Sequence, residues 1–230
     1  MAAKRIELKI RLDNLRCSFL KVFEADAMDS GDKPAFSGHF LFDPGDEENM
    51  AELKKLRQAM LKVAIGKWGR EAGKRTLIAL MKKNLTCLHN GNDKTDADEK
   101  VMEGYENKKF LSARSYVRPT VIGRGREPLS EEDGLLFSGC WVTVYVNLWA
   151  QTGKWGKRIN AQLMGIQFVK TGDSFGGGQA ADPGVFESLA DEFDDDGDFT
   201  DFSDDGLEDA SNIELNDGDD VLDDDDDIPL

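Results

Sequence analysis

The sequence predicts a mainly β domain with inserted helices (an α+β fold), followed by a long acidic tail. Six stretches alternate apolar and polar residues, which is typical of half-buried strands. Between residues 43 and 83 the apolar spacing changes to that of helices. All 29 Lys and Arg, but only 23 of the 45 Asp and Glu, lie in residues 1–175. We therefore expect a domain over residues 1–175 with a net charge of +6.

The remaining 55 residues, 176–230, hold the other 22 acids and no base, which gives a net charge of −22. They contain too few large apolar groups to offset the entropy of ordering the chain. We expect this segment to be a disordered acidic tail. Such an asymmetry between the two parts of a chain indicates nucleic acid or a membrane surface as a partner, or masking of the basic part by the acidic one.

The N-terminal part of the domain is predicted to be extended. Ile6, Leu8, Ile10 and Leu12 alternate with charged residues, so residues 5–13 form a half-buried strand. Residues 15–24 continue as a second strand, and residues 29–34 form a turn. A third strand covers residues 36–42. Its phenylalanines share one face, and core burial is favoured over a row of stacking rings.

Two helices are predicted over residues 43–83. Asp43 is the expected N-cap and Pro44 the first helical residue, with acids following near the positive end of the helix dipole. The residues expected to face the core are Met50, Leu53, Leu56, Met60, Val63 and Ala64. The first helix should end near residues 66–69. The second, over residues 70–83, should pack Leu77, Leu80 and Met81, and residues 83–103 should form a polar loop.

A basic strand is predicted next, over residues 110–119. Arg114, Tyr116 and Arg118 alternate on one face, so that a ring lies between two cations. Arginine pairs with phosphate or stacks on a base, which makes this triplet a candidate nucleic-acid contact. In the loop that follows, Arg124 and Arg126 are candidates to hold backbone phosphates.

Two further strands, residues 139–150 and 159–169, are joined by a basic turn at residues 151–158. In the first strand, Val142, Val144, Val146 and Leu148 lie on one face. The opposite face carries Trp141, Tyr145 and Trp149. Flat rings on an open sheet face suit the stacking of unpaired bases, whereas the alternative is burial beneath a helix or loop. The turn adds Lys154, Trp155, Lys157 and Arg158.

Residues that would carry catalysis or bind a metal are missing from the pattern. Gly73 to Thr76 lacks the earlier glycine of a phosphate loop, and Cys87 with His89 has no second pair to complete a zinc site. We expect no enzymatic activity, no cofactor and no metal. Three widely spaced cysteines fit a reducing compartment, and no stretch is long and apolar enough for a membrane span. We therefore expect a cytoplasmic protein that does not bind membranes.

Two stretches resemble known families. LWAQTGKWGKRINAQLMGIQFVKTGDSFGGG, residues 148–178, resembles bacteriophage single-stranded DNA-binding proteins with an OB fold, and the similarity extends over most of residues 5–178. The end of the chain, DDDDDIPL, resembles the acidic tip of bacterial single-stranded DNA-binding proteins, which docks replication and repair proteins. Here Leu230 replaces the final Phe of that tip. The first resemblance implies a five-stranded barrel, with the helices of residues 43–83 inserted as a cap.

These observations predict a sequence-tolerant single-stranded DNA-binding protein that acts in phage DNA replication or recombination inside a bacterial host. The expected DNA-binding residues are Trp141, Tyr145, Trp149, Lys154, Trp155, Lys157, Arg158, Arg114, Tyr116, Arg118, Arg124 and Arg126. The tail would mask the groove when DNA is absent. Its tip would recruit replication or recombination proteins through Asp225, Asp226, Asp227, Ile228, Pro229 and Leu230. Homo-oligomerisation stays open. The alternative is an acidic interaction protein, a DNA mimic that sequesters a basic host protein.

Overall fold

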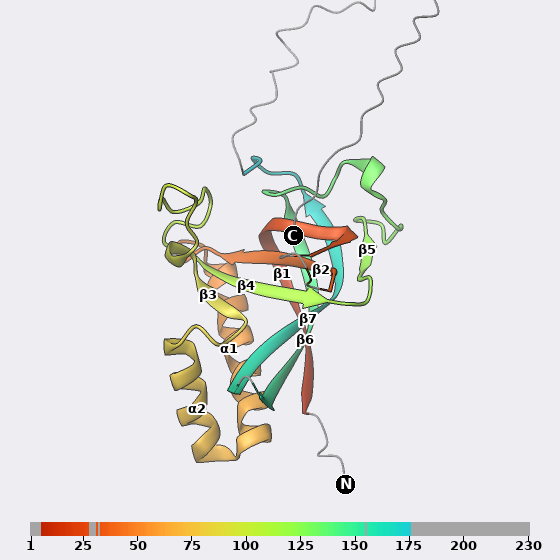
Figure 1. Ribbon diagram of the computed structural model, residues 1–230. Coiled ribbons are helices and arrows are strands. Elements are labelled where there is room, and N and C mark those ends of the chain that lie inside the picture. Colours follow the sequence, from red (N-terminus) through yellow and green to blue (C-terminus); the bar gives the residue numbers. More distant parts are fainter. Residues whose placement is uncertain (1–5, 28–30, 32, 155, 176–230) are drawn as a thin grey trace, which may run out of the picture. The chain divides into compact units, whose positions relative to one another are not determined.

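The structure, a computed structural model, describes residues 6–27, 31, 33–154 and 156–175 (Figure 1). The chain divides into two compact units, residues 1–180 and 181–230, and the second lies wholly outside the described residues. The elements are β1 (Glu7–Asp26), β2 (Ala35–Phe42), α1 (Glu47–Trp68), α2 (Arg70–Lys82), β3 (Leu88–Asn90), β4 (Lys109–Ser115), β5 (Thr120–Ile122), β6 (Trp141–Gly153) and β7 (Gly156–Lys170). In this part of the chain, the strands form one sheet in the order β3-β4-β2-β1-β6-β7-β5. The predicted fold class, a mainly β, OB-fold-like domain with two helices, is confirmed.

The first strand, β1, is a single element where the sequence predicted two. Its first half pairs antiparallel with β6, and its second half pairs antiparallel with β2. The register shifts between Leu12 and Leu15 and again after Ser18, and Asn14 and Phe19 have φ values of 51° and 50°. Such bulges bend a strand. They allow one strand to turn from the β6 side of the sheet to the β2 side.

The sheet curls so that β4 approaches β7, although these strands are not neighbours in the strand order. The Gln162 side chain donates from Nε2 to Ser115 Oγ over 3.4 Å. Nearby, the amide of Ile159 donates to the carbonyl of Leu85 over 3.3 Å. The short strand β5 pairs parallel to the outer edge of β7. The sheet therefore has an inner face and an outer face, as in a barrel.

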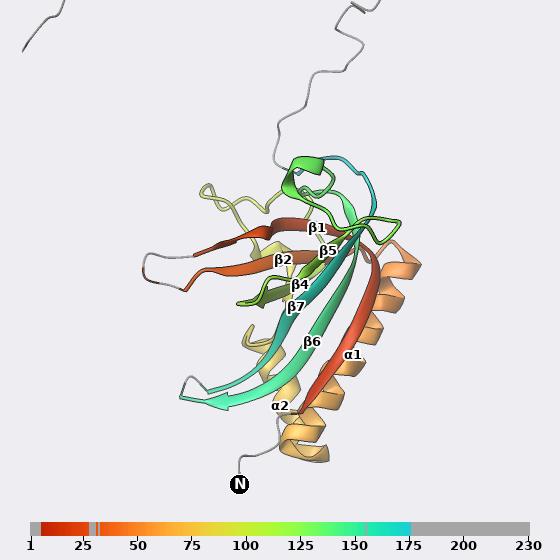
Figure 2. The same ribbon diagram turned by 90° about the vertical axis from the view of Figure 1, so that its right-hand side faces the viewer.

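The inner face is a continuous apolar core. Val142, Val144, Val146 and Leu148 of β6 are fully buried, as their alternation predicted. They belong to the same cluster as the buried residues of α1, and Figure 2 shows the two helices along one side of β1 and β6. Each such side chain contributes about 1.5–3 kcal/mol on burial. Phe40 and Phe42 of β2 are also buried, which confirms the core assignment for these two phenylalanines.

Three details of the helices differ from the prediction. Asp46, not Asp43, caps α1, because its Oδ1 accepts from the amides of Glu48 and Asn49 at 2.9 and 3.1 Å. The Asp43 carboxylate instead accepts from the amide of Gly45, which closes a turn before the helix. The other two are Met50 and Met81, which were expected to pack inward but are 38% and 39% exposed. Helical spacing alone does not say where an apolar stripe ends.

The predicted loop after α2 is partly structured and covers part of the outer face. It contains β3, a 3₁₀ turn at Gly91–Asp93, and a bridge between Thr95 and Val101. Its Tyr105 is buried in a second apolar cluster with Leu41 of β2 and Phe110 of β4. Cross-strand pairing places Leu41 opposite Arg16, which pairs in turn with Trp141. This loop therefore covers the β2 and β4 part of the same face that carries the β6 aromatics.

Candidate nucleic-acid interface

The three aromatic residues of β6 lie on the outer face, each between a residue of β1 and a residue of β7. The three cross-strand rows are Glu7–Trp149–Asn160, Arg11–Tyr145–Gly165 and Arg16–Trp141–Lys170. Successive rings are four residues apart, which corresponds to about 13 Å along a strand. They are therefore separate platforms, and their surroundings differ.

Trp149 lines a groove of about 660 Å³ on this face, which we call the Trp149 groove. Its walls come from three parts of the chain: residues 84–87 and 89, residues 112 and 114–117 at the end of β4, and the hairpin residues 149, 151 and 158–162. Four predicted site residues line it together: Arg114, Tyr116, Trp149 and Arg158. They meet because the sheet brings β4 against β7. The indole of Trp149, the phenol of Tyr116 and two guanidinium groups thus line one groove.

The β4 side of the groove differs from the predicted strand face. The strand ends at Ser115, so Tyr116 and Arg118 lie in the turn that follows, and the regular alternation of this triplet was wrong. Tyr116 is 60% exposed. The Arg114 guanidinium lies 5.6 Å from the centre of the Tyr116 ring and donates to the Lys33 carbonyl over 2.9 Å. Arg118 is exposed but does not line the groove.

The hairpin places its cations on different sides. Neighbouring residues of a strand point to opposite faces. Arg158 lines the Trp149 groove, whereas the Lys157 ammonium lies 5.4 Å from the ring of Trp68 on α1. The same indole donates from Nε1 to Thr152 Oγ1 over 3.0 Å, which ties the hairpin to the helix. Lys154 is exposed near the turn, and Trp155 lies outside the described residues.

Tyr145 is the most open of the three β6 rings, at 41% exposure. It lines a smaller groove of about 250 Å³ with Arg11 and Met164, which we call the Tyr145 groove. Gly165, its partner on β7, has no side chain to cover the ring. The Arg11 guanidinium is paired with Asp13 at 2.9 Å. A flat group can therefore approach this phenol ring from solvent.

Trp141, in contrast to Tyr145, is partly buried among neighbouring side chains. The Lys170 ammonium lies 4.6 Å from its ring, and the indole lines a small pocket of about 130 Å³ with Arg16 and Phe175. The Arg16 guanidinium lies 4.2 Å from the Phe175 ring and donates to the carbonyls of Gly139 and Asp173. Residues 172–175 therefore lie beside this end of the outer face.

The loop arginines, Arg124 and Arg126, are both exposed. The Gln167 side chain donates from Nε2 to the Gly123 carbonyl over 3.2 Å, and Gln167 also lines the Tyr145 groove. The loop is therefore anchored next to that groove. The tip residues at positions 225–230 lie outside the described part of the chain.

Sequence reasoning did not assign a role to four cations on the outer face: Lys9, Arg11 and Arg16 of β1, and Lys170 of β7. The alternation of β1 placed Lys9 and Arg11 outward, but only the pairing of β1 with β6 brings them beside Asn147 and Tyr145. His89 was also missed. It lines the Trp149 groove, and burial lowers its pKa, so the imidazole is neutral at pH 7.

The described residues contain side chains of the types that ligate metals, and three cysteines. Among the described residues, no group of three or more His, Cys, Asp or Glu side chains is placed to hold a metal ion. Cys17 and Cys140 lie with their sulfurs 3.3 Å apart, and all three cysteines are buried free thiols. The helices in this part of the chain are too short or too polar to cross a membrane.

Comparisons with known proteins point in one direction. A family model described as "Enterobacter phage Enc34, ssDNA-binding protein" matches residues 8–202. "Putative protein p50" of Acyrthosiphon pisum secondary endosymbiont phage 1 is 32% identical over 185 residues, which is 80% of this chain and 95% of that protein. The solved single-stranded DNA-binding protein from bacteriophage Enc34, in complex with ssDNA, is 26% identical with a TM-score of 0.59, over 73% of this chain and 89% of that one. Its C-terminal truncation, at 24% identity, a TM-score of 0.56, and coverage of 76% and 100%, shows the shared fold.

Proposed function

The chain belongs to the phage family typified by the Enc34 single-stranded DNA-binding protein, and from this premise we propose that it coats single-stranded DNA with little preference for sequence. It serves phage DNA replication or recombination in the host cell. DNA lies along the outer face of the sheet, where bases stack on rings and phosphates meet cations. The family itself is one of binding proteins, not enzymes.

The observation that carries the proposal is the convergence of four side chains in the Trp149 groove. Arg114, Tyr116, Trp149 and Arg158 come from strands and turns far apart in the chain, yet they line one open groove. Rings accept any base, since every base has a flat π face. Guanidinium groups bind phosphate through paired hydrogen bonds without reading sequence. This combination favours an unpaired strand over a duplex, whose bases are already stacked.

From this groove the strand continues along the face to the Tyr145 groove. The cations nearest to that path are Lys9 and Arg11 of β1, together with the exposed Arg124 and Arg126 of the neighbouring loop. Stacking contributes roughly 1–3 kcal/mol per base. Two open platforms about 13 Å apart along β6 therefore engage separate bases of one strand.

The test is a titration of a fluorescently labelled single-stranded oligonucleotide, and of the matching duplex, with the full chain. We expect tighter binding of the single strand, similar affinities for different base compositions, and a loss of affinity in Trp149→Ala with Arg158→Ala. Lys62→Ala, an exposed cation of α1 outside these grooves, is the matched control. Equal binding by the double variant and the wild type refutes the assignment of the groove.

The acidic tail is proposed to compete with DNA for the same cations. Its support is the charge division of −22 against +6, together with the position of Phe175, which lies against Arg16 beside the outer face. A chain truncated after Gly178 should therefore bind oligonucleotide more tightly at low salt, with a difference that shrinks as salt screens the tail. Equal affinities at low salt refute the masking.

The tip, Asp225 to Leu230, is proposed to recruit replication or recombination proteins once DNA has displaced the tail. Its acids followed by Ile228, Pro229 and Leu230 present charge and an apolar end together. Substitution of Leu230 by Ser should abolish capture of such a partner while leaving DNA affinity unchanged. The DNA-mimic alternative predicts the opposite pattern, in which the tail binds a basic host protein and the domain has no affinity for DNA.

A further inference from the structure

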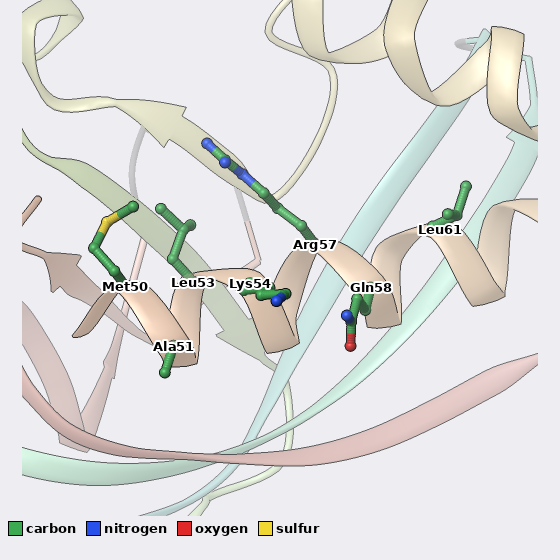
Figure 3. Close-up of a pocket in the computed structure, with 7 residues that line it drawn as sticks. All are labelled: Met50, Ala51, Leu53, Lys54, Arg57, Gln58 and Leu61. Atoms are coloured by element: carbon green, nitrogen blue, oxygen red, sulfur yellow. The ribbon is translucent and has the colours of Figure 1, made fainter. Parts of the chain in front are cut away.

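Away from the outer-face grooves, the described residues contain an open groove on α1 and a pair of contacting thiols. The α1 groove has a volume of about 580 Å³, and Figure 3 shows its apolar side chains, such as Met50, along the same stretch of helix as Lys54 and Arg57. No cysteine, histidine or carboxylate lines it. The thiols belong to Cys17 and Cys140, whose sulfurs lie 3.3 Å apart. The thiol pair therefore brings together two groups that can react with each other, whereas the α1 groove does not.

Cys17, in β1, and Cys140, just before β6, face each other across neighbouring strands. The Cys17 amide donates to the Cys140 carbonyl over 3.0 Å. The residues adjacent to them, Arg16 and Trp141, are cross-strand partners. Facing residues of antiparallel strands have Cα atoms about 4.5–5.5 Å apart, within the range of roughly 4.4–6.8 Å that disulfides span. The sulfurs need to approach by about 1.2 Å to form a bond, and small rotations of the two side chains can supply an approach of this size.

The two thiols differ in their readiness to react. Their mutual hydrogen bond lowers the pKa of Cys140 and raises the pKa of Cys17, and burial raises the pKa of Cys17 further. The charge of Arg16 also favours the Cys140 thiolate. Because the thiolate is the form that reacts with peroxides, Cys140 is the nucleophile of the pair. Cys87 lines the Trp149 groove, yet burial raises its pKa to about 12 and keeps it protonated at pH 7.

We propose that Cys17 and Cys140 form a redox-modification site, which a peroxide converts into a stabilising disulfide in the folded protein. The Cys140 thiolate attacks one oxygen of hydrogen peroxide. An S–O bond forms, the O–O bond breaks, and the released hydroxide takes up a proton to become water. Cys17 then attacks the sulfur of the sulfenic acid. The S–S bond forms, the S–O bond breaks, and the hydroxide that leaves takes the Cys17 proton to become a second water. Overall, both thiols are oxidised and the peroxide is reduced.

The chain segment beside the pair gives a small oxidant a route to it. Residues 134–139 form neither helix nor strand. The Cys17 thiol donates to the Phe137 carbonyl of this segment over 3.4 Å, so the segment lies against the buried sulfurs. Segments held by few regular hydrogen bonds open locally at a lower free energy than the whole domain unfolds. Hydrogen peroxide therefore reaches Cys140 while the domain stays folded.

The crosslink joins β1 to β6 behind one end of the outer face. Neighbouring residues of a strand point to opposite faces, so the thiols lie on the inner side, behind Arg16 and Trp141. A bond between residues far apart in the sequence restricts the unfolded chain more than the folded one, which stabilises the fold. Disulfides in reducing compartments are usually transient, so the modification marks oxidative conditions and is reversed by thiols. The inference does not depend on the DNA-binding assignment.

The experiment treats the folded full chain with hydrogen peroxide, alkylates the remaining thiols in denaturant, and maps an unreduced digest by mass spectrometry. We expect a peptide pair joined through Cys17 and Cys140, an alkylated Cys87, and loss of the crosslink after treatment with dithiothreitol. The oxidised protein should also unfold at a higher urea concentration than the reduced protein.

Two variants test the roles of the cysteines. Cys87→Ser, the matched control at another buried cysteine, should still form the crosslink, whereas Cys17→Ser should stop at a Cys140 sulfenic acid that dimedone traps. Mapping of the wild type is decisive even if Cys17→Ser fails to fold. The proposal is overturned if the treated wild type keeps all three thiols, if the crosslink involves Cys87 or joins two molecules, or if it forms only in urea. It is also overturned if oxidation does not raise the urea concentration needed for unfolding.

Discussion

Replacement of Tyr145 by alanine should separate the contribution of this ring to DNA binding from its contribution to folding. The ring is 41% exposed and its β7 partner is Gly165, so little packing is lost with it. Loss of a cross-strand pair costs less than about 1 kcal/mol. Because part of the ring is covered, we take the lower part of the range for stacking on one base, about 1–2 kcal/mol. That energy corresponds to an affinity for single-stranded DNA about 5- to 30-fold weaker.

The assay is fluorescence anisotropy of a labelled single-stranded oligonucleotide, with urea unfolding measured on the same proteins. Tyr145→Phe should bind like the wild type, since stacking requires the ring and not the hydroxyl. Phe19→Ala is the matched control, because Phe19 is also 41% exposed but lies on the part of β1 next to β2. Equal affinity of Tyr145→Ala and the wild type would refute the reasoning, as would an equal loss in Phe19→Ala.

Three further predictions follow from the geometry. Arg158→Ala should weaken DNA binding and reduce the steepness of the plot of log binding constant against log salt concentration by about 1. Lys157→Ala, on the α1 side of the hairpin, should change that slope less in the same salt titration. Burial lowers the pKa of His39 from 6.5 to about 4, so the unfolded chain binds this proton at a higher pH than the folded chain does. Up to about 3 kcal/mol of the stability present above pH 6.5 is therefore lost as the pH falls towards 4. In urea unfolding across this range, the stability of His39→Gln should decline less than that of the wild type. Asp46→Ala should lower the free energy of unfolding by about 1 kcal/mol in the same assay, because it removes the cap of α1.

Periodicity predicted the elements well where one face of a strand is buried. The alternation in β6 correctly separated Val142 to Leu148 from the outer aromatics, and two helices lie where helical spacing replaced alternation. The exact start of a helix and the continuity of a strand were harder to predict from sequence. Asp43 and Asp46 are both plausible caps, and the turn closed by Asp43 moves the start of α1 by one turn. The bulges at Asn14 and Phe19, which make β1 continuous, have no signal in the pattern.

The sequence indicated which residues could bind DNA, but it did not indicate which of them lie together. Arg114, Tyr116 and Trp149 were recognised one by one, while their convergence depends on the approach of β4 to β7, a contact between strands that are distant in the chain. Lys157 and Arg158 look equivalent in composition, but as neighbours in β7 they point to opposite faces, Arg158 into the Trp149 groove and Lys157 towards Trp68. Pairing and closure of a sheet are properties of the whole domain, and no local window contains them.

The strict alternation of β6 has an evolutionary consequence. Positions 142, 144, 146 and 148 maintain the fold, while 141, 145 and 149 face outward. Relatives are therefore free to diversify the outward set by point substitution while the interior stays constant. Insertion or deletion of a single codon within the strand would exchange the two sets at once, so drift in this lineage should proceed by replacement, with length changes confined to the turns.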